Sequence, residues 1–171
     1  MTRRAAKLLN NAPKIGNAHA PKAVFGHAGS ITGASDAIYG VRLREPLRAS
    51  RACESHLVMS ASGALTALQQ LDLKRGDIEG RADLGHNVKD ISATIASGSF
   101  HSLVVAPCSM QTLTSTALGL ADNLVSRATD VMLKERRLLV LMARQTRLYL
   151  RRIWALRMAT KAALGALSGS A

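Results

Sequence analysis

The feature that most constrains the fold is a unit that occurs three times along the chain. Each unit consists of a short apolar run, a few small or polar residues, and a longer segment with helical character. The runs read HLVMS at 56–60, LVVAPCS at 103–109 and RLLVLMAR at 137–144. Continuous apolar strands that alternate with helices are typical of a parallel sheet covered on both faces. The pattern therefore predicts an α/β fold with a three-layer, doubly wound parallel sheet.

An earlier and weaker unit is expected at 22–31, followed by the turn TGAS and by a helix from Asp36. This strand is weak because VFGHAGSI contains two glycines and a histidine. Pro46 falls inside the expected helix, where a proline costs roughly 3 kcal/mol. Residues 1–24 are basic and poorly periodic, so we expect a mobile basic tail there and a single α/β domain over 25–171.

Composition excludes several classes of protein. The 171 residues suit one domain with a sizeable core, and only 3% of them are aromatic, so that core must be aliphatic. No apolar run approaches the roughly 18 residues of a membrane span, and we expect no secretory signal. The two cysteines and five histidines show neither a disulfide framework nor metal-ligand spacing. We therefore expect a cytoplasmic protein without a metal.

The net charge of +12 is unevenly distributed. No Asp or Glu occurs before Asp36 or after Glu135, and eight basic residues lie between 136 and 161. Such a region could attract nucleic acid, an anionic membrane or a phosphorylated ligand, although a solvated helix surface is the simplest interpretation. The scarcity of aromatic residues argues against a protein that binds single-stranded nucleic acid, because such binding depends on stacking of bases on aromatic side chains. We therefore expect no nucleic-acid partner and no membrane span.

Small and hydroxyl-bearing residues follow the predicted strands, at the sheet edge where ligands bind in such folds. Converging helix N-termini capped by serine form a suitable cradle for a phosphate, and an arginine could clamp that phosphate with two hydrogen bonds. For each serine alone, an ordinary helix cap is the competing interpretation. The residues concerned are Gly33, Ala34 and Ser35 after the first strand, Ser60 after the second, Ser109 and Thr112 after LVVAP, and Arg144 after LLVLMA.

Longer motifs resemble one known family. The segments ITGAS, AIYGVRL, ESHLVMS, DISATIASGSF, VVAPCSMQTL and ADNLVSRATDVMLKERRLLVLMARQT occur in the order found in UbiX-type flavin prenyltransferases, which are flavodoxin-like flavoproteins. The resemblance runs from about residue 31 to about residue 166. It implies a flavodoxin- or Rossmann-like fold and a flavin-binding domain over 25–171.

The resemblance also implies a reaction. Family members transfer a dimethylallyl group from dimethylallyl phosphate to reduced FMN, at flavin N5 and then C6, without a metal. Their product, prenylated FMN, serves a UbiD-type decarboxylase, for example in ubiquinone biosynthesis. The family assembles as a large homo-oligomer, commonly a dodecamer, with active sites at subunit junctions.

Site residues follow from the resemblance position by position. Positive charge on the departing phosphate assists carbon–oxygen bond cleavage, and basic residues on the prenyl-phosphate side would supply it. The implied catalytic positions are Ser35, Gln70, Arg127 and Gln145. The implied flavin contacts are Gly33, Ala34, Ser35, Ser60, Ser109, Met110, Gln111, Thr112 and Arg144, and the implied contacts to the substrate phosphate are Lys134 and Arg144.

Several positions depart from the family pattern. Glutamine replaces a family glutamate at Gln70 and Gln145, and it cannot titrate, so acid–base work would be lost there. Gln111 replaces a lysine, Asp36 a glycine and Arg147 a proline. The family's last strand and its PPxPAFY segment have no counterpart. Two hypotheses follow: a working flavin prenyltransferase, or a catalytically impaired FMN-binding relative that acts as a binding or assembly subunit.

Overall fold

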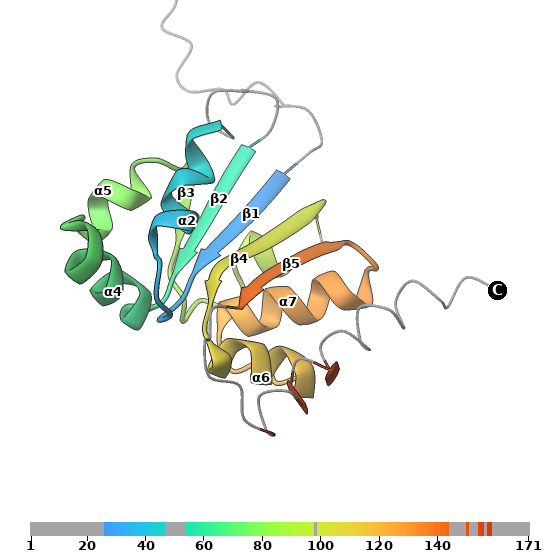
Figure 1. Ribbon diagram of the computed structural model, residues 1–171. Helices are drawn as coiled ribbons and strands as arrows, with labels where there is room; N and C mark the ends of the chain where they lie inside the picture. The colour runs from blue at the N-terminus through green and yellow to red at the C-terminus, as the bar shows by residue number, and fades with distance from the viewer. Residues whose placement is uncertain are drawn as a thin grey trace, which may run out of the picture.

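The computed structural model describes residues 26–46, 54–97, 99–143, 150, 154–155 and 157–158, so the predicted tail lies outside it. Five parallel strands form one sheet in the order β3-β2-β1-β4-β5 (Figure 1). This confirms the predicted doubly wound α/β fold. The strands are β1 (Gly26–Ile31), β2 (Glu54–Met59), β3 (Leu84–His86), β4 (Ser102–Cys108) and β5 (Leu138–Ala143).

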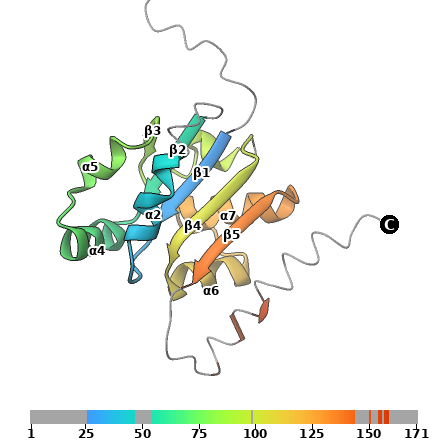
Figure 2. The same cartoon turned by 45° about the horizontal axis from the view of Figure 1, so that its top comes forward.

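Helices cover both faces of the sheet, as the continuous apolar strands predicted. Helices α2, α4 and α5 lie on one face, and α6 and α7 lie on the other (Figures 1 and 2). Alternate side chains of β2 divide the core accordingly: Leu57 and Met59 pack under α4 and α5, whereas Val58 packs with α6 and α7. The helices are α2 (Ile38–Arg42), α4 (Ala61–Leu71), α5 (Arg75–Glu79), α6 (Met110–Leu118) and α7 (Leu124–Lys134), with a 3-10 turn, η1 (Thr94–Ala96).

The segment after β4, expected to continue as helix, is two helices. Helix α6 ends where Gly119 adopts a left-handed conformation with φ of 67°, which glycine tolerates without steric cost. Helix α7 begins after Asn123, whose side-chain oxygen accepts hydrogen bonds from the amides of Val125 and Ser126. A glycine end signal and an asparagine start signal therefore divide this segment.

The expectation that Pro46 falls inside the first helix is wrong. Helix α2 ends at Arg42, and residues 44–46 are again helical after a turn at Leu43. Pro46 therefore lies in the first turn of that second stretch, where its missing N–H group is not needed. The short exposed strand β3 was not predicted.

At the other edge of the described sheet, β5 leaves one row of side chains exposed, formed by Leu138, Val140 and Met142. No helix among the described residues combines the length and the apolar character needed to cross a bilayer.

Candidate functional site

The carboxyl ends of β2, β1 and β4 are neighbours, and hydrogen bonds hold the turns after them together. The amide of Thr32 donates to the carbonyl of Pro107 (3.2 Å), and the amide of Ser109 donates to Oγ1 of Thr32 (2.7 Å). On the other side, the amide of Ser60 donates to the carbonyl of Ile31 (3.1 Å). The strand order reverses between β1 and β4, which is where open α/β sheets bind ligands. The structure thus brings three of the four predicted turns to one edge, here called the rim (Figure 1).

Thr32 is the residue at the rim that the sequence reasoning missed. Its buried hydroxyl donates to the carbonyl of Pro107 (2.8 Å) while accepting the amide of Ser109, so it joins the turns after β1 and β4. Its position in the sequence could have identified it, because Thr32 places a hydroxyl between the last apolar residue of a predicted strand and the glycine of the following turn.

Ser60 and Ser109 are helix caps at the rim. Oγ of Ser60 accepts the amide of Gly63 (2.9 Å) at the start of α4, and Oγ of Ser109 accepts the amide of Thr112 (3.2 Å) at the start of α6. Each cap leaves the other first-turn amides of its helix available to an anion. Met110, the first residue of α6, packs against the core, whereas the side chain of Gln111 is exposed.

The turn at 33–35 lies directly against α4. A Cβ atom on Gly33 would come 2.5 Å from Oγ of Ser62, so only glycine fits this approach. Ala34 donates its amide to the carbonyl of Thr32 (2.8 Å), whereas the amides of Gly33 and Ser35 donate no hydrogen bond within the described part of the chain. Together with the two helix starts, this narrow turn fits an anionic group such as the phosphate of FMN.

Gln70 reaches this turn from the far end of α4. Its Oε1 accepts the amides of Asp36 (3.0 Å) and Ala37 (3.2 Å), just before α2. Asp36 has a φ of 67°, in the left-handed region that favours glycine. Gln70 therefore positions the turn, whereas its predicted catalytic role stays a prediction.

The two basic residues expected near the substrate phosphate lie on α7. Oδ2 of Asp130 lies 2.6 Å from Nζ of Lys134 and 3.8 Å from Nη1 of Arg127. Helix α7 runs back toward the start of β5, where Leu138 pairs with Ser102 at the amino end of β4. Seven residues of helix separate Arg127 from Lys134 by roughly 10 Å. The structure therefore leaves Lys134 at the opposite end of the sheet from the rim of its own chain.

Two predicted site residues, Arg144 and Gln145, lie outside the described residues. Strand β5 ends at Ala143, which pairs with Cys108 beside the rim. Their roles stay predictions.

Burial raises the pKa of the Cys108 thiol to about 12. The thiol is therefore protonated at neutral pH and unsuited to act as a nucleophile. Among the described residues, no group of three or more His, Cys, Asp or Glu side chains could hold a metal ion.

Comparison with known proteins identifies the family. The model of the Flavoprotein family matches residues 27–166. Flavin prenyltransferase UbiX of Escherichia coli is 47% identical over 122 residues, which cover 70% of this chain and 65% of that relative. Flavin prenyltransferase UbiX of Salmonella typhimurium is 44% identical over 135 residues, covering 78% of this chain and 70% of the relative. The chain thus spans about two thirds of the length of these relatives.

Solved structures agree with the sequence comparison. A UbiX protein in complex with FMN and dimethylallyl pyrophosphate superimposes with a TM-score of 0.78 and 38% identity, over 81% of this chain and 74% of that one. A dodecameric FMN-dependent UbiX-like decarboxylase of Escherichia coli gives a TM-score of 0.78 and 38% identity, over 81% and 76%. The chain therefore belongs to the Flavoprotein family, among the relatives of flavin prenyltransferase UbiX.

Proposed function

We propose that this protein is a flavin prenyltransferase that transfers a dimethylallyl group from dimethylallyl phosphate to reduced FMN. The observation that carries the proposal is the convergence of three amide-rich turns at the rim, joined by the hydrogen bonds of Thr32 and Ser60. The solved UbiX relative with FMN and dimethylallyl pyrophosphate supports it, because it shares the fold over 81% of this chain.

In this mechanism the rim holds the FMN phosphate through the amides of Gly33 and Ser35 and the first turns of α4 and α6. The reduced flavin, when bound, supplies the nucleophilic ring that accepts the dimethylallyl group. The chain contributes binding, orientation and positive charge. Arg127 and the predicted Arg144 would stabilise the negative charge that develops on the departing phosphate.

We propose that the working form is a homo-oligomer. Lys134 lies away from the rim of its own chain, so it can serve the substrate phosphate only at the rim of a neighbouring copy. The dodecameric UbiX-like relative supports a homo-oligomer. Prenylated FMN would then pass to a UbiD-type decarboxylase, and no metal takes part.

A second candidate function is FMN binding without turnover. Asp36 places a carboxylate beside the proposed phosphate cradle, and Gln70 uses its side-chain oxygen to hold the turn. Neither Gln70 nor Gln145 can exchange a proton as a glutamate would. This candidate predicts a protein that retains FMN and makes little product.

One experiment separates the candidates. The purified protein is examined for bound flavin by its absorption spectrum, then incubated without oxygen with reduced FMN and dimethylallyl phosphate. Prenyl transfer predicts a flavin heavier by one isoprene unit in the mass spectrum. Bound FMN without such a product favours the second candidate, and Gln145→Glu should then raise the yield. A protein that binds no FMN contradicts both.

A further inference from the structure

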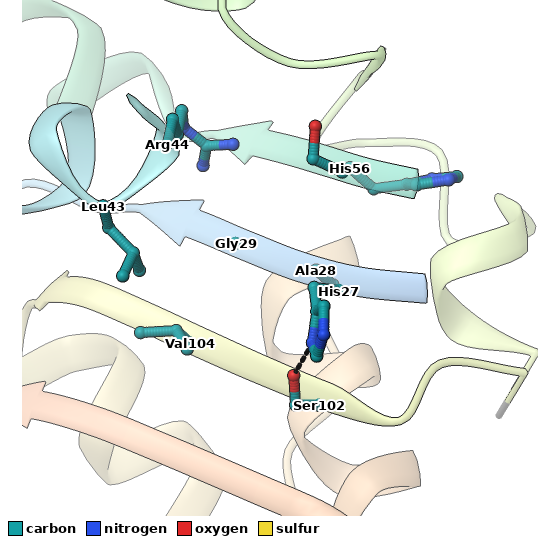
Figure 3. A pocket seen from close by; sticks show the side chains of 9 residues that line it. His27, Ala28, Gly29, Leu43, Arg44, His56, Ser102 and Val104 are labelled. Carbon is teal, nitrogen blue, oxygen red and sulfur yellow. Dashed lines mark hydrogen bonds between the residues drawn. The ribbon is translucent and has the colours of Figure 1, made fainter. Parts of the chain in front are cut away.

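A small cavity lies on the α2 face of the sheet, near the amino ends of the strands and away from the rim (Figure 3). Its volume is about 70 Å³. That is room for several water molecules or one small tetrahedral ion, and too little for a flavin or a nucleotide. The side chains around it come from three strands and from the segment after α2: His27, Ser55, Ser102, Val104, Leu43 and Arg44.

Arg44 is the unusual member of this lining. Arg44 is only 4% exposed, and its Nε has no hydrogen-bond partner among the residues that the structure describes. A Cβ atom on Gly29 would come 2.7 Å from Nη2 of Arg44, so the guanidinium occupies the space of a missing side chain on β1. Burial lowers the pKa of Arg44 to about 10, which still leaves it charged at neutral pH.

No acidic side chain of the chain balances this charge. All 11 Asp and Glu residues lie within the described ranges, and none of them forms an ion pair with Arg44. Glu45, the next residue, pairs instead with Arg42 and Arg81. An unpaired buried charge costs several kcal/mol, so a counter-ion from solution would be strongly favoured here.

The wall opposite Arg44 is mostly apolar and carries one pair of polar side chains. Nδ1 of His27 and Oγ of Ser102 are hydrogen-bonded to each other across the start of β1 and β4 (Figure 3). The hydroxyl of Ser55 is already used, because it donates to Oδ2 of Asp83 (2.9 Å). The side chain of His56 lies on the opposite face of the sheet, where its ring packs against those of Phe100 and His86. Arg44 is therefore the group that decides which ligand this cavity takes.

We propose that this cavity binds a small inorganic oxyanion, such as phosphate or sulfate, on the guanidinium of Arg44. The planar fork of an arginine matches two oxygens of such an ion, and the cavity volume suits an ion of this size. A carboxylate from another protein is a poor occupant, because Arg44 is almost fully buried. The site is separate from the FMN cradle at the rim and does not depend on the proposed activity.

The test is thermal unfolding of the full chain with sodium phosphate raised at constant ionic strength and with FMN in excess. The wild-type midpoint should rise saturably by a few degrees, because a ligand that binds only the folded state stabilises it. Arg44→Met should abolish that rise. The matched control is Arg42→Met, two residues earlier and exposed, which should keep it. FMN binding should be the same in all three proteins.

Two results would overturn the proposal: a wild-type midpoint that does not respond to phosphate, or an equal response in Arg44→Met. If Arg44→Met does not fold, Arg44→Lys serves in its place, because it keeps the charge and loses the fork. Calorimetric titration should then show phosphate affinity at least tenfold weaker than in the wild type. An unchanged affinity in Arg44→Lys would also refute the site.

Discussion

Asp36 shows at the scale of one residue how this chain departs from an ideal phosphate-binding turn. Its φ of 67° lies in the left-handed region, which glycine adopts without steric cost and which Asp adopts more readily than most residues, at a cost of about 1 kcal/mol. A carboxylate at this position would also disfavour an anion bound by the amides of the turn. Asp36→Gly should therefore raise the free energy of unfolding by about 1 kcal/mol and tighten FMN binding several-fold. Urea denaturation and fluorescence titration with FMN measure the two effects.

Asp36→Asn separates charge from backbone strain. Asparagine removes the charge and keeps a side chain at the left-handed position, so it should improve FMN affinity as the glycine does, with a smaller gain in stability. Weaker FMN binding by both variants would show that the carboxylate helps the turn rather than opposing the ligand.

Gln70 offers the complementary test of the same turn. Gln70→Ala removes the acceptor of two backbone amides, those of Asp36 and Ala37, and should cost about 1 kcal/mol of stability and weaken FMN binding. Gln70→Glu keeps an acceptor for both amides and should retain the stability. The exposed neighbour in Gln69→Ala is the control and should behave as wild type. Equal behaviour of Gln70→Ala and Gln69→Ala would contradict the positioning role.

At the scale of elements, α2 depends on a glycine to approach the sheet. A Cβ atom on Gly40 would come 2.1 Å from the carbonyl oxygen of Ala106 in β4, which is backbone and cannot move aside. Gly40→Ala should therefore destabilise the protein by 2 kcal/mol or more, about the cost of overpacking a core. Gly76→Ala in α5, where no atom of the described residues lies within 4 Å of an added Cβ, should instead stabilise by up to about 1 kcal/mol. Denaturant midpoints of the two variants should move in opposite directions.

The sequence located the strands correctly where burial on both faces of the sheet produces a continuous apolar run. β2 and β4 are buried on both faces, so their apolar runs located them to within two residues. β3 was missed because it has three residues, LGH, and little of it is buried. The helix expected from Asp36 begins at Ile38 and ends at Arg42, and a turn at Leu43 separates it from the helical residues 44–46.

For the whole molecule, the site was predictable to the extent that it follows from topology. Parallel strands bring their carboxyl ends to one edge, so the turns at Gly33, Ser60 and Ser109 could be placed together from sequence. The hydrogen bonds of Thr32 and Gln70 were not predictable, because they join residues 33 to 77 positions apart. The separation of Lys134 from the rim also required the structure, since it depends on the direction of α7.

The last prediction concerns the stability of the whole fold against acid. Desolvation by burial lowers the pKa of His56 and of His86. A hydrogen bond of 2.7 Å joins Nδ1 of His56 to Nε2 of His86. The carboxylate of Glu54, 3.5 Å from Nε2 of His56, opposes the shift in the pKa of His56. The unfolded chain binds protons at these rings near pH 6.5 and the folded chain does so only at lower pH. Stability should therefore be fully present above pH 6.5 and fall as the pH decreases toward 5, with uptake of at most two protons.

His86→Gln should make this pH dependence shallower, because it removes one titrating ring while keeping a side chain that can hydrogen-bond to His56. Urea unfolding at several pH values between 5 and 7.5 measures the slope for both proteins. Asp90 does not interfere, since hydrogen bonds from Ser92 lower the pKa of its carboxyl below 3.8, outside this range. Stability that rises as the pH falls from 7 to 5 would show that the carboxylates near the two rings, Glu54 above all, outweigh their burial.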